Sequence, residues 1–378
     1  MMFKTIWLIP CIFLFSPYFT NCDKLLAVTS LVRHGERLGS YEGFDPNDPN
    51  IDIRMENPSD QLLNLGVEEL YNVGLWLRHH YSDFLRLKYD PKEIYVQSID
   101  FDRCLMSAGA LLAGLYPPVG DEVWNRNIPW QPVPIHTTPN KVDILLQWSA
   151  CPYYTIQSRK ALELQKKISE ENAELFKFLT EKTGSPMNLS STLLLYNVLE
   201  GEKLINLTLP LWTHGVIRDI KPLVEVSFVV DTIDKRLKIL RAGPLVHRLL
   251  EQFDRAISGK KFGTTDDIYR KMMLYSTADM TVYYLADSLN VDNFGIVNYG
   301  FSIYFELWEA DNGTHYVDVF FRNSTDVYAP SHPGRVRGYG STLSFSAFKE
   351  MAGRVSINIT DWFSFCKNLL KSENSTRQ

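Results

Sequence analysis

Two apolar runs in the first third of the chain each lead into a charged loop and then into a helix-like segment. The first run, Leu25 to Val32, is rich in aliphatic and β-branched residues and ends at the loop RHGER. The second run, Glu93 to Ser98, is followed by the polar loop Ile99 to Arg103. Such short apolar runs are typical of strands buried on both faces of a parallel sheet. This pattern predicts an α/β fold whose functional loops gather outside the carboxyl ends of the strands.

The middle and the C-terminal half of the chain differ from this pattern. Residues 122–224 combine Trp- and Pro-rich connections with polar helical stretches, which predicts an inserted, mainly α-helical cap. Strand-like patterns return at 224–233, 270–285, 302–310 and 315–323, and the last two alternate as an antiparallel hairpin would. We therefore expect a mixed, mainly parallel central sheet flanked by helices. The expected division is a signal peptide at 1–22, an α/β core at 23–121 and 225–370, the helical cap at 122–224 and a polar tail at 371–378.

The N-terminal end has the pattern of a secretory signal peptide. Lys4 precedes an apolar run, Thr5 to Phe15, that is too short to span a bilayer as a helix. Sequons for N-glycosylation follow and agree with secretion. They begin at Asn188, Asn206, Asn312, Asn323, Asn358 and Asn374. The C-terminal residues are polar, so we expect a secreted protein without a membrane anchor, and we favour secretion over a lysosomal location.

Composition and cysteine usage exclude several classes of partner. The chain has 378 residues, of which 45% are hydrophobic and 22% charged, as in ordinary globular proteins. A net charge of -5 gives no basic surface for nucleic acid. Cys11 lies in the expected signal and Cys22 at its cleavage point, and the three remaining cysteines cannot all pair with one another. Because no C-x-x-C or Cys/His cluster occurs, we expect no structural zinc site.

The loop RHGER concentrates charge at the end of a buried strand. Arg33, His34 and Arg37 converge there, and Arg103 ends the loop of the second strand. Guanidinium groups brought together repel one another unless an anion holds them, and their planar donors suit phosphate oxygens. Taken alone, Arg103 fits a surface ion pair better and His34 fits a buried core histidine. The combination, together with Gly35, favours a phosphate site.

Several segments of the chain resemble one known family. RHGERLG resembles the R-H-G-x-R-x-P signature of the histidine acid phosphatases, a branch of the histidine phosphatase superfamily. QLLNLGVEEL and SIDFDRCLMSAGALLAGLYPP resemble later segments of that family, as do NLTLPLWTH, AGPLV and LYSTADMTV, and all occur in the family's order. The resemblance runs from about Lys24 to Cys366, nearly the whole chain after the expected signal.

The resemblance implies a phosphomonoesterase that works without metal or cofactor. In the family, the motif histidine forms a phosphohistidine, a role that falls on His34, and Arg33, Arg37 and Arg103 would bind the phosphate. Asp279 would be the proton donor. The histidine that precedes this aspartate in the family, and that also contacts phosphate, is Ala278 here.

The resemblance also implies features outside the catalytic centre. Cys151 and Cys366 match cysteines that the family joins in a disulfide, which leaves Cys104 as a buried thiol. A homodimer is a further implication. Gly39 stands where the family has proline, which loosens the loop after the motif.

Two hypotheses of different classes remain. The first is a secreted acid phosphatase whose activity is weakened by Ala278, since the loss of one transition-state donor costs on the order of 10² to 10³ in rate. The second is a catalytically weakened homologue that acts as a secreted binding protein, for instance in venom or saliva. We favour the enzyme because a decayed site would be expected to lose its arginines or His34 as readily.

Overall fold

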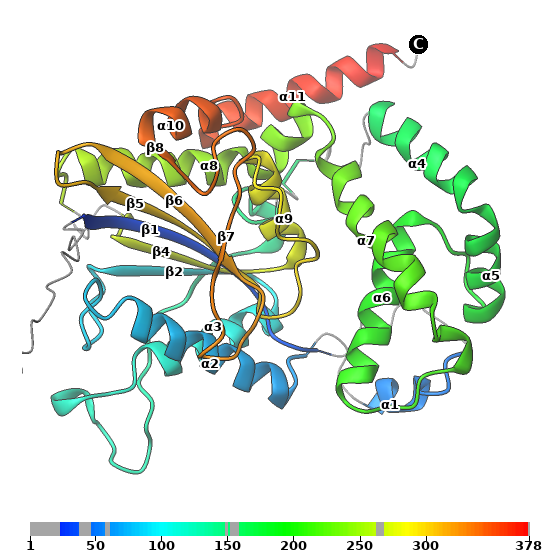
Figure 1. The fold of residues 1–378 in the computed structure, drawn as a ribbon, viewed down its shortest axis with the longest axis horizontal. Coiled ribbons are helices and arrows are strands. Elements are labelled where there is room, and N and C mark those ends of the chain that lie inside the picture. The colour runs from blue at the N-terminus through cyan, green and yellow to red at the C-terminus, as the bar shows by residue number, and fades with distance from the viewer. Residues whose placement is uncertain are drawn as a thin grey trace, which may run out of the picture.

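An eight-stranded mixed sheet runs through the protein, whose computed structural model describes residues 23–37, 47–56, 61–147, 150–151, 159–261 and 268–376 (Figure 1). The strand order is β3-β2-β4-β1-β5-β6-β7, and β8 pairs with β6. The strands are β1 Lys24–Arg33, β2 Ile94–Ile99, β3 His136–Thr138, β4 Met272–Thr277, β5 Ser302–Glu309, β6 His315–Arg322, β7 His332–Pro333 and β8 Thr342–Ser344. The expected signal peptide lies outside the described residues.

Parallel and antiparallel pairing divide the sheet into two parts. β1, β4, β2 and β3 pair in parallel, and β5 pairs with β1 in the antiparallel direction. β5 and β6 form the antiparallel hairpin that their alternation predicts. The sheet therefore has the mixed character expected from the sequence, and the parallel strands end at one common edge.

Helices cover both faces of the sheet (Figure 1). On one face, α2 Asn64–His80 and α3 Asp102–Leu115 bury an apolar cluster against β1, β2 and β4. On the other face lie α8 Lys235–Ile257, α9 Asp279–Ser288 and α10 Phe345–Gly353, over a second cluster. A sheet with two covered faces explains why β1 and β4 are apolar without alternation.

A group of helices forms the cap beside the carboxyl end of β1 (Figure 1). Its helices are α4 Arg159–Glu171, α5 Ala173–Thr183, α6 Leu189–Leu204 and α7 Val216–Thr232, with the short α1 Ile51–Glu56 next to them. The cap buries an apolar cluster of its own. The terminal helix α11, Ile359–Thr376, completes the described structure, and none of the described helices is long and apolar enough to cross a membrane.

The strand expected at residues 224–233 is wrong, because these residues belong to helix α7. The β-branched residues there suggested a strand. The buried side chains of this helix, however, include Ile220, Leu223, Val224 and Phe228, whose spacing of one, three and four residues places them on one helical face. Packing against the cap helices therefore overrides the local strand preference. Helix α7 also runs through position 224, where we expected the cap to end.

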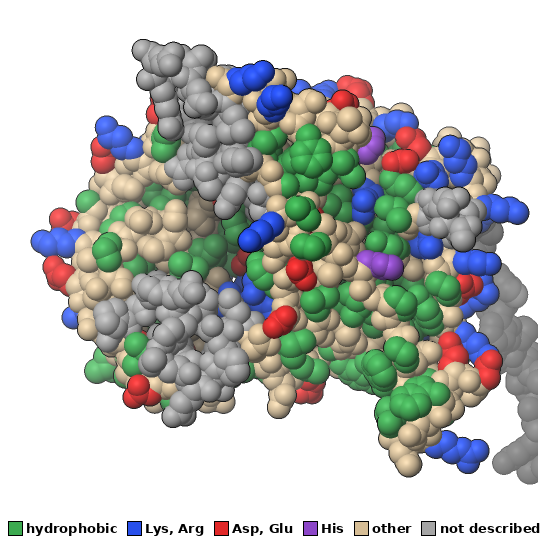
Figure 2. Space-filling view, turned by 180° about the vertical axis from the view of Figure 1, so that it is seen from behind, with side chains coloured by type: hydrophobic (Ala, Val, Ile, Leu, Met, Phe, Trp, Pro, Cys, Tyr) green, Lys and Arg blue, Asp and Glu red, His purple; other side chains and the backbone are tan. Residues whose placement is uncertain are grey.

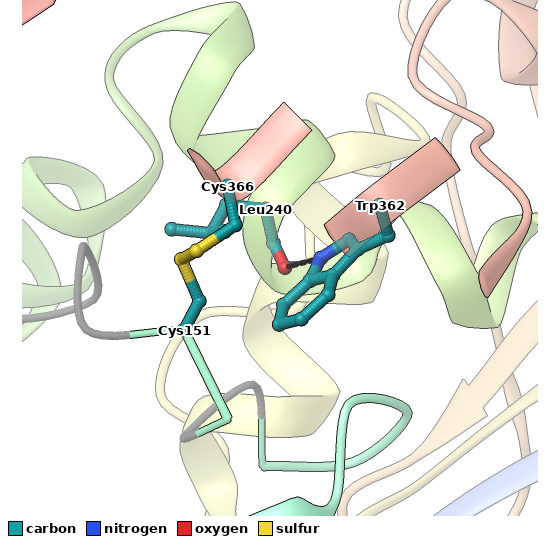
Figure 3. The surroundings of a disulfide bond; sticks show 4 residues. All are labelled: Cys151, Leu240, Trp362 and Cys366. Carbon is teal, nitrogen blue, oxygen red and sulfur yellow. Dashed lines mark hydrogen bonds between the residues drawn. A yellow bond between two sulfur atoms is a disulfide. The ribbon is translucent and has the colours of Figure 1, made fainter. Parts of the chain in front are cut away.

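A disulfide ties the segment between β3 and the cap helices to the terminal helix. Cys151 and Cys366 are bonded with their Cα atoms 5.9 Å apart, which confirms the pairing implied by the family resemblance. Beside it the indole Nε1 of Trp362 donates a hydrogen bond to the carbonyl of Leu240 at 2.8 Å (Figure 3). α11 is thus fastened to α8 and to residue 151. Cys104 is buried and unpaired, as predicted.

We expect the Cys151–Cys366 bond to stabilise the protein strongly, because it closes a loop with a sequence separation of 215 residues. A Cys151→Ala/Cys366→Ala variant should lose roughly 3–5 kcal/mol of unfolding free energy, measured by urea unfolding. Reductant should destabilise the wild type to a similar degree and leave the double variant unchanged. A wild-type curve that does not move on full reduction would contradict the prediction.

Candidate active site

Parallel pairing of β1 with β4 brings the predicted proton donor to the first arginine of the motif. Arg33 is the last residue of β1 and lies opposite Thr277, the last residue of β4. Asp279 follows two residues later, and its Oδ2 lies 3.0 Å from Arg33 Nη2. The side chain of Arg33 is 3% exposed and that of Asp279 is 14% exposed, so this ion pair is largely shielded from water.

The backbone around His34 fixes the position of the imidazole. The His34 amide donates to the carbonyl of Thr277 at 2.9 Å, which carries the parallel pairing one residue past the strand end. The next residue, Gly35, packs against helix α2, where a Cβ atom on Gly35 would lie 2.4 Å from the carbonyl oxygen of Gly66. The loop can approach the helix this closely only because residue 35 has no side chain. The Gly35 amide is satisfied by Ser107 Oγ at 3.1 Å.

Hydrogen bonds select one tautomer of the His34 ring. Nδ1 lies 2.9 Å from the carbonyl oxygen of Gly35, and a carbonyl only accepts, so Nδ1 carries the proton. Nε2 accepts from Nε of Arg103 at 3.2 Å. The lone pair of His34 is therefore on Nε2 and faces the arginines.

His34 is held in the neutral form by its surroundings. Burial is the main cause that lowers its pKa well below the ordinary value, and the charges of Arg33, Arg103 and Arg37 lower it further. The Gly35 carbonyl acts in the opposite direction. A neutral imidazole persists at acidic pH and keeps its lone pair available for nucleophilic attack.

The structure brings the remaining predicted arginines to the same place. Arg103 lies in the first turn of α3, which begins at Asp102, so it is not in a loop as we expected. Its guanidinium carbon lies 4.5 Å from the ring centroid of Phe101, and its Nε reaches His34. Arg37 is 9% exposed and forms an isolated antiparallel bridge with Leu62. Gly39, where the family has proline, lies outside the described residues.

Ala278 directly precedes the helix that carries Asp279. It is the N-cap residue of α9, and its side chain makes no capping hydrogen bond. Its methyl group packs against the apolar cluster under α8 and α9. The position therefore contributes no polar side chain to the site.

Two acidic side chains at the site were not predicted as functional residues. Glu36 is 1% exposed, and its amide donates to Glu69 Oε2 of helix α2 at 2.9 Å. Burial, followed by the nearby charge of Glu69, raises the pKa of Glu36 to about 8 although Arg33 and Arg37 act in the opposite direction. Glu36 lies inside the quoted motif, so its position was visible in the sequence, but its burial was not.

Tyr299 was also missed, because it follows the motif by more than 260 residues and nothing in the sequence around it marks a site. Its ring centroid lies 4.0 Å from the guanidinium carbon of Arg33 and 5.6 Å from the centroid of the His34 ring. Among the described residues, no group of three or more His, Cys, Asp or Glu side chains is arranged to hold a metal ion.

Comparison with known proteins gives a consistent result. The profile of the histidine phosphatase superfamily (branch 2) matches residues 24–322. The chain is 36% identical to the lysosomal acid phosphatase of Xenopus laevis over 323 residues, which are 82% of this chain and 73% of that protein. It is 32% identical to the prostatic acid phosphatase of Bos taurus over 357 residues, which are 92% of this chain and 88% of that protein.

Solved structures share the fold at much lower identity. The phytase from Citrobacter braakii superposes with a TM-score of 0.64 at 17% identity, covering 91% of this chain and 99% of that chain. A Hafnia alvei phytase in complex with tartrate gives a TM-score of 0.66 at 14% identity, with coverage of 89% and 98%.

We expect the burial of Glu36 to make the protein less stable as the pH rises from 4.5, the ordinary pKa of a glutamate, to about 8, the pKa of Glu36 in the folded protein. In this window the folded state keeps the Glu36 proton while the unfolded chain has lost it, so the unfolding free energy falls by about 1.4 kcal/mol per pH unit. In Glu36→Gln this contribution is absent. The measurement is urea unfolding of both proteins from pH 5 to 8.

The difference between the two proteins isolates Glu36 from other titrating groups. Glu68→Gln, on the exposed side of α2, is a matched control whose stability should follow the wild type at every pH. Parallel curves for the wild type and Glu36→Gln would show that Glu36 is ionised throughout this range.

Proposed function

Because the chain belongs to branch 2 of the histidine phosphatase superfamily and is a phosphatase, we propose that it hydrolyses phosphomonoesters through a phosphohistidine on His34. The observation that carries this proposal is the tautomer of His34. Nδ1 is fixed as the donor to Gly35, so Nε2 has the lone pair and is surrounded by cationic groups. A neutral nucleophile among guanidinium groups is suited to a dianionic phosphate ester.

In the first step, Nε2 attacks phosphorus and the bond from phosphorus to the ester oxygen breaks. Arg33, Arg37 and Arg103 bind the non-bridging oxygens and stabilise the charge that they carry in the transition state. The hydrogen bond from Arg103 to Nε2 must first be released, because the same lone pair forms the new bond. The phosphate replaces His34 as the acceptor for Arg103.

Asp279 supplies the proton that the leaving alkoxide needs. In the substrate complex the phosphate group takes the place of Asp279 at Arg33, and the protonated Asp279 side chain donates to the ester oxygen. In the second step Asp279, now ionised, takes a proton from water. The water oxygen attacks phosphorus, the bond between phosphorus and Nε2 breaks, and inorganic phosphate leaves.

Secretion and glycosylation are part of the proposal. The asparagines of five sequons, at Asn188, Asn206, Asn312, Asn323 and Asn358, are exposed, which is what glycosylation needs. Asn374 lies in α11. The signal-like N-terminal residues support entry into the secretory pathway.

A homodimer remains a proposal that exposed apolar side chains support. Many hydrophobic side chains lie exposed on the face shown in Figure 2. In the connection between α3 and β3, Trp124 is 57% and Trp130 is 45% exposed. Exposed aromatic side chains of this size are typical of protein contact surfaces.

The second candidate function is a secreted binding protein that holds a phosphate group and turns it over poorly or not at all. The observation that favours it is Ala278, which gives the site no polar side chain at the start of α9. The buried Arg33 and the neutral His34 favour the enzyme.

We expect the protein to hydrolyse a chromogenic aryl phosphate and to keep this activity below the ordinary pKa of a histidine, because burial and the neighbouring arginines hold the pKa of His34 well below its usual value. His34→Ala should reduce turnover to background, since it removes the lone pair that attacks phosphorus. The measurement is steady-state kinetics, with circular dichroism to show that the variant is folded. Turnover that survives His34→Ala would overturn the phosphohistidine mechanism.

We expect Ala278→His to raise kcat/KM by roughly 10- to 1,000-fold, the range for one oriented donor to a transition-state oxygen. Ala278→Leu, which enlarges the side chain without a donor, is the matched control and should not raise it. An inactive wild type that stays inactive in the folded Ala278→His variant would favour the binding protein.

A further inference from the structure

A short segment before β5 wraps around the end of β1 and presents Tyr299 to the site. The Arg33 amide donates to the carbonyl of Phe301 at 2.8 Å, and the Gly300 amide donates to the carbonyl of His34 at 3.2 Å. The side chain of Arg33 adds a third tie, from Nη1 to the carbonyl of Val297 at 2.6 Å. Tyr299 is therefore placed by contacts to the same two residues that begin the motif.

The ring of Tyr299 lies against both functional groups of the motif. The guanidinium carbon of Arg33 is 4.0 Å from its centroid, within the range of a cation–π contact. The His34 ring is tilted by 49° against it at 5.6 Å. The aromatic ring thus supports the group that binds phosphate and the group that attacks it.

The hydroxyl of Tyr299 is a donor without a use inside the described protein. The oxygen is buried and has no hydrogen-bond partner among the described residues. Burial of an unpaired hydroxyl costs free energy, and tyrosine hydroxyls normally find a partner. Burial also raises the pKa of Tyr299, so the phenol keeps its proton at every pH at which the phosphatase would work.

A second buried tyrosine distinguishes a role in the site from a role in packing. The hydroxyl of Tyr116 is likewise buried without a partner among the described residues. Its ring packs against Tyr89 and lies near Arg78, whereas the ring of Tyr299 contacts Arg33 and His34. The contacts, rather than the unpaired oxygen alone, point to a ligand.

We propose that Tyr299 is a substrate-binding residue whose hydroxyl donates a hydrogen bond to an oxygen of the phosphate group held by Arg33. This inference deepens the proposed function and rests on it for the identity of the ligand. The phenol supplies a neutral donor at a site that has no polar side chain at position 278. It adds no charge, so it binds phosphate without increasing the repulsion among the arginines.

The test removes the hydroxyl and keeps the ring. Tyr299→Phe should weaken binding of inorganic phosphate, measured by calorimetry at pH 5.5, by roughly 5- to 20-fold, and should lower kcat/KM for an aryl phosphate by 10- to 100-fold. The thermal midpoint of the ligand-free protein should stay the same or rise, because an unpaired buried hydroxyl is removed. A purely structural role would lower the midpoint instead.

Tyr116→Phe is the matched control. It also deletes a buried hydroxyl without a described partner from a ring near an arginine, Arg78, whose guanidinium carbon lies 5.9 Å away. Phosphate affinity and kcat/KM should remain those of the wild type. In the Tyr299→Phe background, Ala278→His should raise kcat/KM by a larger factor than in the wild type, because it restores a donor where one has been lost.

The outcomes separate this inference from the proposed function. Unchanged phosphate affinity in the folded Tyr299→Phe variant would overturn the inference, whatever the activity. Weakened phosphate binding in a protein whose wild type shows no turnover would support Tyr299 as a phosphate ligand and would reject the phosphatase mechanism.

Discussion

The ion pair between Arg33 and Asp279 connects the ends of two parallel strands, and the chemistry of the site depends on it. It compensates one of three guanidinium charges that surround a buried imidazole. Without a counter-charge, these groups would repel one another and destabilise the folded chain. The parallel register of β1 and β4 supplies this counter-charge from Asp279, which follows Arg33 in the chain by 246 residues. The same contact places the proposed proton donor beside an arginine that we propose binds phosphate.

The charge of Glu36, a carboxyl group close to Arg33 and Arg37, depends on pH. Glu36 follows Gly35 in the motif and stays protonated until about pH 8, because it is buried beside Glu69. At acidic pH it therefore leaves Arg33 and Arg37 with their full positive charge toward a ligand. When Glu36 ionises, an internal carboxylate offsets part of that charge and competes with phosphate. The buried carboxyl thus favours anion binding on the acidic side of neutrality.

The sequence predicted those features that local patterns encode. The apolar run that became β1, the alternation of β5 and β6 and the charged loop at Arg33 each depend on neighbouring residues, and all three are present in the structure. The strand expected at 224–233 was wrong because cap packing decides its conformation. The pairing of Cys151 with Cys366 followed from the family resemblance, since spacing alone leaves three cysteines with no preferred pair. Tyr299 could not be predicted, because its position depends on how the segment before β5 folds over β1.

Unpaired buried polar atoms at this site help to decide whether the site still binds a ligand. Arg33 Nε, Glu36 Oε1 and the Tyr299 hydroxyl are all buried without hydrogen-bond partners among the described residues. Each such atom lowers the stability of the ligand-free fold, and replacing these side chains with apolar ones would remove that cost. A chain that had lost its ligand would gain stability from replacing Glu36 or the Tyr299 hydroxyl with apolar groups, whereas Arg33 is also kept by its ion pair with Asp279. Three such atoms beside a neutral His34 therefore fit a protein that still binds an anion here. The missing polar side chain at position 278 is then better explained by an altered phosphate site than by a site that has lost its ligand.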